Sequence, residues 1–238
     1  IRVMTMINSR RVIGIIGGMG PMATADIFRK IIEKTDAERD CEHLHILIDN
    51  NTDIPDRTAC IIEGSDAPAL LMSESAKRLE SMGADLLIIP CNTAHFFHGR
   101  VSECCGIPVL HMPRETAEAV RSLGIKCAGL LATEGTLLSG IYDGIFEEYG
   151  IELRRPSEQA RKMLMHIIYN EVKAGRPADT EVLEEELCRM EAEGCEAFIL
   201  ACTELPIAFA GNTLHRFIDP TSVLAEAAIT AAGGKLKR

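Results

Sequence analysis

Two of the nine cysteines occupy matching positions in this 238-residue chain. Cys91 and Cys202 each end an apolar run, and a turn containing threonine follows each of them. A thiolate can take a proton from a carbon atom, and a thiol can return a proton from the other side. Two thiols that flank a substrate therefore suit racemisation or epimerisation, provided that the fold brings them together.

A thiol needs help to act as a base at neutral pH. Free cysteine has a pKa of about 8.5, so only a few per cent is thiolate at pH 7. Helices are predicted to begin directly after each cysteine, and a helix N-terminus carries unpaired N–H groups and about half a positive charge. Such an end can stabilise a thiolate or bind a substrate carboxylate. Amides and hydroxyls nearby would stabilise the enediolate-like charge that develops when the α-proton leaves.

The segments around the two cysteines belong to a longer internal repeat. RLESMGADLLIIPCNT at 78–93 matches RMEAEGCEAFILACTE at 189–204, and GIIGGMG at 14–20 matches GLLATEG at 129–135. Two matching blocks in the same order indicate two similar α/β halves. We place the boundary near residues 112–115. Residues 1–112 with 220–238 are predicted to form the first half and residues 113–219 the second, so that the last helix returns to the first half.

Short apolar runs alternate with helical stretches along the chain. Strands are predicted at 12–16, 44–48, 86–89, 108–110, 127–132, 197–200 and 217–218, and helices at 22–34 and 69–82. Strands that are apolar throughout predict parallel sheets covered by helices on both faces, hence an α/β fold. Ligands bind at the carboxyl ends of such strands. Two halves related by a pseudo-twofold would therefore place Cys91 and Cys202 across one cleft.

Composition excludes several classes of function. The net charge is −10 and aromatic residues make up 4% with no Trp, which argues against nucleic-acid and anionic-membrane partners. No apolar run reaches the roughly 18 residues of a membrane span, and residues 1–11 lack the apolar core of a signal peptide. An odd number of cysteines without a C-x-x-C pair predicts reduced thiols in the cytoplasm and no structural zinc site.

Five stretches carry a family resemblance, at residues 17–24, 54–57, 90–95, 131–136 and 201–206. Together they resemble the aspartate/glutamate racemase family, the cofactor-independent amino-acid racemases. The resemblance implies two flavodoxin-like halves with the active site between them, no cofactor or metal, and a homodimer that acts on an acidic amino acid. It also implies that Cys91 and Cys202 are the two acid/base thiols, whereas some relatives replace the first with Thr.

The resemblance further implies which residues hold the substrate. Arg57 and Lys173 match the cations that bind a side-chain carboxylate, and a guanidinium can do so through two parallel bonds. Without the resemblance, Arg57 would be interpreted as a solvated turn residue and Lys173 as a helix-end lysine. His95 is interpreted as packed or capping, and Arg114, where the chain departs from the family pattern, as facing solvent. The other expected substrate contacts are Met19, Asn92, Thr93, Thr133, Thr136, Thr203 and Glu204.

Three alternatives remain open beside racemisation of aspartate or glutamate. Gly18, Gly20 and Ala23 have the spacing of a dinucleotide fingerprint, although Pro21 removes an N–H that a pyrophosphate would use. A related carbon-acid enzyme, such as a maleate isomerase, a hydantoin racemase or a decarboxylase, would share the paired architecture. A catalytically silent binding protein on the same scaffold is the third alternative, and the intact cysteine pair argues against it.

Overall fold

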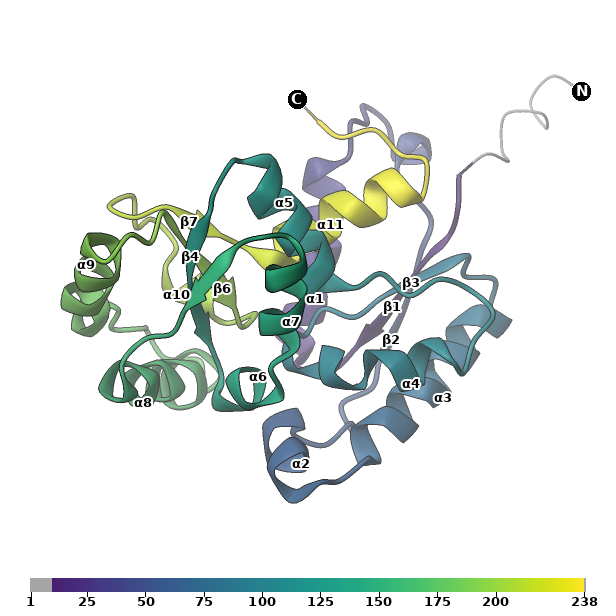
Figure 1. The fold of residues 1–238 in the computed structure, drawn as a ribbon. Helices are drawn as coiled ribbons and strands as arrows, with labels where there is room; N and C mark the ends of the chain where they lie inside the picture. Colours follow the sequence, from purple (N-terminus) through teal and green to yellow (C-terminus); the bar gives the residue numbers. More distant parts are fainter. Residues whose placement is uncertain (1–9, 238) are drawn as a thin grey trace, which may run out of the picture.

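Two parallel sheets form the frame of the molecule (Figure 1). The computed structural model describes residues 10–237, so most of the segment considered as a signal peptide lies outside the described residues. One sheet has three strands in the order β2-β1-β3, and the other has four in the order β5-β4-β6-β7. Every strand pair is parallel, as the apolar runs predicted.

The first sheet comes from the N-terminal part of the chain. Its strands are β1 (Ile13–Gly17), β2 (Ile46–Asn50) and β3 (Leu86–Ile88). The helices around it begin with α1 (Pro21–Lys34), whose proline occupies a first-turn position where no N–H is needed. The remaining helical segments are η1 (Asp40–Glu42), α2 (Arg57–Glu63), α3 (Ala67–Ser81), η2 (Thr93–Phe97) and α4 (His98–Ser102).

The second sheet contains β4 (Cys127–Ala132), β5 (Glu152–Arg154), β6 (Ala197–Ala201) and β7 (Phe217–Ile218). The helix α5 (Met112–Ser122) leads into it from the first half. The other helical segments are α6 (Glu134–Ser139), α7 (Ile141–Glu148), α8 (Glu158–His166), the π-helix η3 (Ile167–Val172), η4 (Glu181–Leu183), α9 (Glu184–Ala192), α10 (Leu205–Ala208) and α11 (Pro220–Ala231).

Two strand predictions differ from the structure. The predicted strand at 108–110 is reduced to a single bridge between Leu87 and Val109, because Pro108 has no N–H to donate and the chain enters α5 at Met112. The strand β5 was not predicted. It lies at the edge of its sheet, and its charged residues Glu152 and Arg154 break the apolar pattern.

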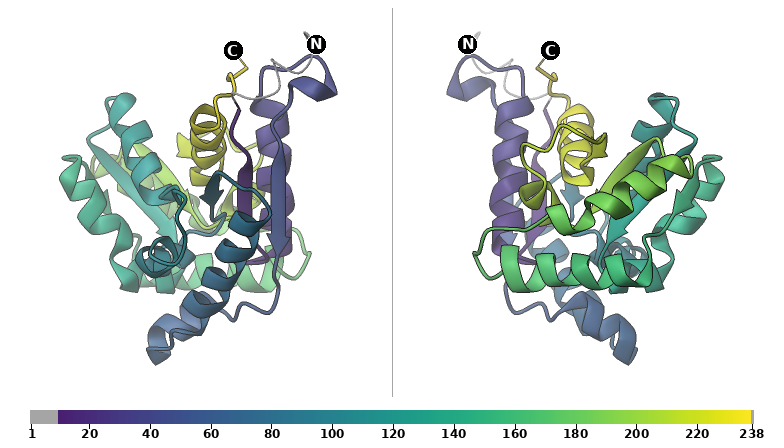
Figure 2. Two further views of the ribbon diagram at one scale, coloured as in Figure 1. Left: turned by 90° about the vertical axis from the view of Figure 1, so that its right-hand side faces the viewer. Right: turned by 90° about the vertical axis from the view of Figure 1, so that its left-hand side faces the viewer.

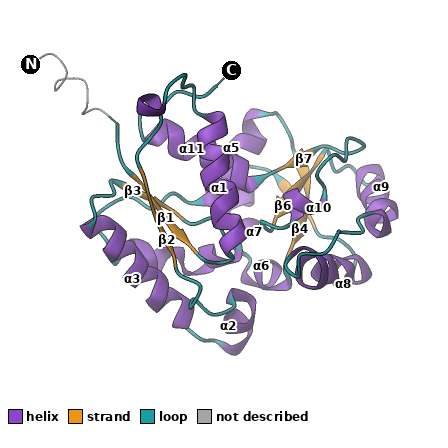
Figure 3. Ribbon diagram, turned by 180° about the vertical axis from the view of Figure 1, so that it is seen from behind, coloured by secondary structure: helices purple, strands orange, loops and turns teal. Residues whose placement is uncertain are grey.

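Helices cover both faces of each sheet (Figure 3). In β1, Ile16 packs in one apolar cluster with Met72 of α3, whereas Ile13 and Ile15 pack in another with Leu224 of α11. The strands β4 and β6 divide their side chains between two further clusters in the same alternating way. Alternation along a buried strand thus fills a core on each side of the sheet.

The last helix packs on the first half of the chain (Figure 2). α11 lies against α1 and α5, and two ion pairs fasten it to α1. Lys30 Nζ is 2.7 Å from Asp219 Oδ2, and Lys34 Nζ is 2.7 Å from Glu226 Oε1. Asp219 also caps α11 by accepting from the Thr221 N–H. Within residues 10–237, none of the helices has the length and apolar character to cross a membrane.

Candidate active site

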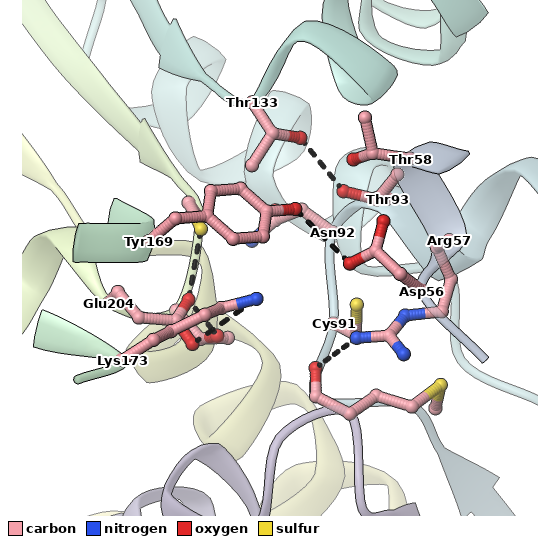
Figure 4. Close-up of a pocket in the computed structure, with 13 residues that line it drawn as sticks. Asp56, Arg57, Thr58, Cys91, Asn92, Thr93, Thr133, Tyr169, Lys173 and Glu204 are labelled. Carbon is pink, nitrogen blue, oxygen red and sulfur yellow. Dashed lines mark hydrogen bonds and ion pairs between the residues drawn. The ribbon is translucent and has the colours of Figure 1, made fainter. Parts of the chain in front are cut away.

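One pocket is lined by both repeat cysteines and by residues of both halves. Figure 4 shows this pocket, with Cys91 among the labelled residues. Cys91 follows β3 and Cys202 follows β6, and each is only 7% exposed. Every site residue predicted from the sequence lines this pocket except Thr136. The two thiols therefore meet at the carboxyl ends of strands from different halves, where the repeat predicted them.

The helices that follow the cysteines are short. After Cys91 the chain forms the five-residue 3₁₀ helix η2, and after Cys202 the α-helix α10 begins only at Leu205 and is four residues long. Elements this short add little to an aligned macrodipole. Charged side chains beside the thiols therefore dominate the electrostatics of the pocket.

Arg57 provides the positive charge beside Cys91. Its guanidinium is buried and donates to three carbonyl oxygens, those of Ile54 at 3.2 Å, Pro55 at 3.0 Å and Met19 at 3.1 Å. Burial lowers the pKa of Arg57, but the adjacent Cys91 and Asp56 more than offset this and raise the pKa overall. The interpretation of Arg57 as a solvated turn residue is therefore wrong, because the side chain is a buried cation at the start of α2.

Glu204 provides a negative charge beside Cys202. The Cys202 thiol donates to Glu204 Oε2 across 3.0 Å, and the Thr203 hydroxyl donates to the same oxygen across 2.9 Å. Burial and the Glu204 carboxylate raise the pKa of Cys202 well above its usual range. Cys202 is therefore held as a thiol, and the two cysteines have opposite electrostatic surroundings.

Lys173 completes the charged part of the pocket. Its Nζ lies 4.0 Å from Glu204 Oε1 and 4.4 Å from the centre of the Tyr169 ring. Burial lowers the pKa of Lys173, while Glu204 and Cys202 raise it by more. Lys173 is thus a charged group that lines the pocket from the C-terminal end of η3.

A cluster of hydroxyls lies across the boundary between the halves. Thr93 Oγ1 is 3.1 Å from Thr133 Oγ1 and 2.8 Å from Thr136 Oγ1. Thr136 is fully buried and lies behind the two threonines that line the pocket. Asn92 Oδ1 accepts from the Tyr142 hydroxyl at 2.5 Å, while the buried Asn92 Nδ2 has no hydrogen-bond partner among the described residues. This amide is a free donor beside Cys91.

Comparison with known proteins agrees with this geometry. A family model described as Asp/Glu/Hydantoin racemase matches residues 16–228. The chain belongs to this family. An aspartate racemase from Picrophilus torridus has 34% sequence identity and a TM-score of 0.83, with 95% of this chain and 96% of that chain covered. An aspartate racemase homologue from Pyrococcus horikoshii OT3 has 27% identity and a TM-score of 0.78, with 94% and 99% covered.

Similar sequences include other amino-acid racemases. The broad specificity amino-acid racemase RacX of Bacillus subtilis (strain 168) is 28% identical over 81% of this chain and 85% of its own length. The glutamate racemase of Shewanella loihica is 25% identical, but the match spans only 60% of this chain and 55% of that protein. A glutamate racemase structure from Francisella tularensis, at 20% identity and a TM-score of 0.69, shares the fold.

Two positions of the loop after β1 do not offer a free N–H to a dinucleotide in this racemase-family fold. The Gly18 N–H donates to Thr24 Oγ1 at 2.9 Å within the protein, and Pro21 has no N–H. A pyrophosphate needs several free backbone donors at such a loop. The dinucleotide alternative therefore has no structural support in this loop.

Three residues that line the pocket were not predicted, namely Asp56, Thr58 and Tyr169. The Tyr169 hydroxyl donates to Asp56 Oδ2 at 3.2 Å and so links the two halves. Asp56 precedes Arg57 within a matched stretch, and Tyr169 lies one helical turn before Lys173, so both positions carried a signal in the sequence. No pattern in the sequence indicated Thr58.

His95 and Arg114 are placed as the sequence predicted. His95 is buried, and its Nδ1 bonds to the Cys91 carbonyl at 2.8 Å while its Nε2 accepts from the Met112 N–H at 3.0 Å. It is a packed residue that does not line the pocket. Arg114 is exposed and pairs with Glu148 at 2.9 Å.

Proposed function

We propose that this protein interconverts the enantiomers of an acidic amino acid, with aspartate as the preferred substrate, by a two-thiol mechanism that needs no cofactor. The observation that carries the proposal is the position of Cys91 and Cys202 in one pocket, at the strand ends of two similar halves. The 34% identity with an aspartate racemase over nearly the whole chain favours aspartate over glutamate.

The pocket suggests how such a substrate would bind. Asn92 Nδ2 and the hydroxyls of Thr93 and Thr133 are suited to the α-carboxylate, and preorganised donors of this kind stabilise a developing enediolate. Arg57 and Lys173 are suited to the side-chain carboxylate. In this orientation the α-carbon would lie between the two thiols.

The proton transfers follow from the two thiols. A thiolate on one side takes the α-proton and becomes a thiol, and the electron pair of the C–H bond moves into the enediolate. The thiol on the other side then donates its proton to the opposite face of the α-carbon and becomes a thiolate. The substrate is inverted, and the charge has moved from one cysteine to the other.

The two thiols have different surroundings. Glu204 accepts a hydrogen bond from Cys202 and, together with burial, raises its pKa, whereas the Arg57 guanidinium lies beside Cys91. We propose that each enantiomer loses its proton to a different cysteine, so that Cys202 is the base in one direction and the acid in the other. Because the equilibrium constant of a racemisation is one, kcat/KM then has the same pH dependence in both directions.

Proton NMR in D₂O tests the proposal directly. The purified protein, free of pyridoxal phosphate and metal, is offered L-aspartate, D-aspartate, L-glutamate and D-glutamate separately. Loss of the α-proton signal together with formation of the other enantiomer is the expected result, fastest for aspartate. Absence of exchange with all four amino acids would contradict the proposal and favour a hydantoin racemase, a maleate isomerase or a silent scaffold.

We further propose a cytoplasmic homodimer. All nine cysteines are free thiols in the structure, which suits a reducing compartment, and the dimer is what the family resemblance implies. Light scattering after size-exclusion chromatography should give twice the 26.0 kDa of the chain.

A further inference from the structure

We infer that the substrate side chain can extend past Arg57 and Lys173 into an adjoining apolar hollow, so that the same two thiols also racemise amino acids with long apolar side chains. This inference deepens the proposed function and rests on it. It concerns the range of side chains that the site accepts, not the chemistry at the α-carbon.

The hollow continues the thiol pocket at its charged end. The space between the thiols has a volume of about 20 Å³, whereas the hollow has a volume of about 680 Å³. Arg57, Lys173, Thr203 and Glu204 line both. The hollow falls within the usual size range of ligand pockets, and it is much larger than the side chain of aspartate requires.

In the proposed binding orientation, the side chain of the substrate points toward this hollow. The donors suited to the α-carboxylate, on Asn92, Thr93 and Thr133, line only the thiol pocket. The cations at the other end line both spaces. A substrate with its carboxylate at the first end therefore directs its side chain past Arg57 and Lys173.

The wall of the hollow is mainly apolar. Met22 and Ile207 contribute exposed side chains, 71% and 47% exposed respectively, and Val172, Pro177 and Ala178 contribute further carbon surface. Burial of a methylene group against such a surface stabilises a complex by about 0.8 kcal/mol. A straight aliphatic side chain would thus gain binding free energy with each carbon that passes the cations.

The charged end of the pocket does not demand a substrate carboxylate. Arg57 donates to three backbone carbonyls, and Lys173 lies beside Glu204 and over the Tyr169 ring. The carboxylates of Asp56 and Glu204 line the same pocket, so two cations face two anions there. An uncharged side chain can pass this point without leaving a cation that lacks a counter-charge.

Norleucine is the probe, because its straight side chain has no polar atom and reaches beyond the cations. The full chain is offered L-norleucine and L-aspartate in separate α-proton exchange assays. We expect exchange with both. Ile207→Ala should lower kcat/KM for norleucine about tenfold, since loss of apolar contact in a pocket costs 10-fold or more, and should leave kcat/KM for aspartate within about twofold.

A second variant and a control keep the test specific. Met22→Trp should fill part of the hollow and also reduce norleucine turnover while aspartate turnover persists. Ile62→Ala is the matched control, since Ile62 is 65% exposed and does not line the hollow. Retained aspartate activity in each variant shows that the fold is intact.

Each contrary result has a distinct meaning. Exchange with aspartate but none with norleucine would overturn this inference and leave the proposed function in place. No exchange with either would overturn the proposed function, and this inference with it. Norleucine exchange that neither Ile207→Ala nor Met22→Trp changes would show that the side chain lies elsewhere. If either variant changed the number of chains in the assembly, measured by light scattering, the hollow would be a contact between copies of the chain. That result would also overturn the inference.

Discussion

The thiols of the pocket are chemically identical but have neighbours of opposite charge. Arg57 lies beside Cys91 (Figure 4), and the Glu204 carboxylate accepts a hydrogen bond from the Cys202 thiol. A racemisation has an equilibrium constant of one, because the two enantiomers have the same free energy. This does not require the two bases to have the same pKa. Racemisation therefore needs the two thiols, whereas the charged neighbour of each thiol sets its electrostatic environment.

Replacement of either thiol should abolish racemisation. Cys91→Ala and Cys202→Ala each remove the acid for one direction and the base for the other, and positioned proton transfer contributes 10²–10⁴-fold to rate. Enantiomer formation from aspartate should fall by at least about 10²-fold in both variants, measured by chiral chromatography. Cys60→Ala serves as the control, because Cys60 is equally buried but lies outside the pocket. Full activity in either thiol variant would end the two-thiol mechanism.

Glu204→Gln should move the pH profile of racemisation in both directions. The variant removes the charge that, together with burial, raises the pKa of Cys202, so that pKa should fall. Each direction uses Cys202, as the base in one and as the acid in the other, so the alkaline limb of the kcat/KM profile should move to lower pH for both enantiomers. Profiles for L- and D-aspartate check this, and an alkaline limb that stays in place would contradict the role of Glu204.

Arg57→Ala should reduce both activity and stability. Three carbonyl oxygens lose their donor, and hydrogen bonds to a charged group contribute about 1.5–3 kcal/mol each. The variant also removes a buried charge, and the desolvation cost that disappears with it offsets much of this loss. We expect the free energy of unfolding in urea to fall by about 2 kcal/mol and kcat/KM for aspartate to fall at least tenfold. An unchanged kcat/KM would exclude Arg57 from substrate binding.

At the scale of elements, the pocket depends on segments that cross from one half to the other. The π-helix η3 carries Tyr169, whose hydroxyl bonds to Asp56 at the start of α2. Gly135 of α6 lies so close to α2 that a Cβ there would meet Thr58 Oγ1 at 2.6 Å. These contacts bring the two halves together around the thiols.

Asp56→Ala tests this junction. The substitution removes the N-cap bond to the Ala59 N–H at 2.9 Å and the bond from Tyr169, and loss of an N-cap costs about 1 kcal/mol. Thermal unfolding should show a lower midpoint for Asp56→Ala. Asp66→Ala is the matched control, since Asp66 occupies the N-cap of α3 without a side-chain cap bond and should change stability less. If Asp56→Ala and Asp66→Ala lowered the unfolding midpoint equally, the contact between Asp56 and Tyr169 would add nothing to stability.

At the scale of the whole molecule, a buried histidine connects the Cys91 turn to the helix that joins the halves. The Met112 N–H donates to His95 Nε2, so the ring proton is on Nδ1 and is donated to the Cys91 carbonyl. Both nitrogens are used only while the ring is neutral. Burial and the neighbouring His111 lower the pKa of His95 to about 3.

This histidine should make the protein less stable in acid. Below pH 6.5 the unfolded chain binds a proton at His95 that the folded protein excludes until about pH 3, so stability is lost through that range as pH falls. At pH 5 the loss amounts to about 2 kcal/mol. Urea unfolding at pH 7 and pH 5 checks this. His95→Gln should have a smaller difference between the two pH values than the exposed-site control His45→Gln, and equal differences would refute the assignment.

The sequence by itself determined the two halves, the parallel strands and the place of each cysteine, because apolar periodicity and repeated motifs are local properties of the chain. It did not determine β5 or the single bridge at Val109. Pairing at the edge of a sheet depends on the neighbouring strand and not only on the apolar run of residues in the segment.

Only the tertiary structure decided the electrostatics of the site. The pairing of Cys202 with Glu204, the burial of Arg57 and the bond between Tyr169 and Asp56 join residues whose surroundings come from other elements. Whether a charge is solvated or desolvated depends on what the rest of the chain packs against it. A motif can therefore indicate a cation or a thiol, but the fold decides which neighbour sets its protonation.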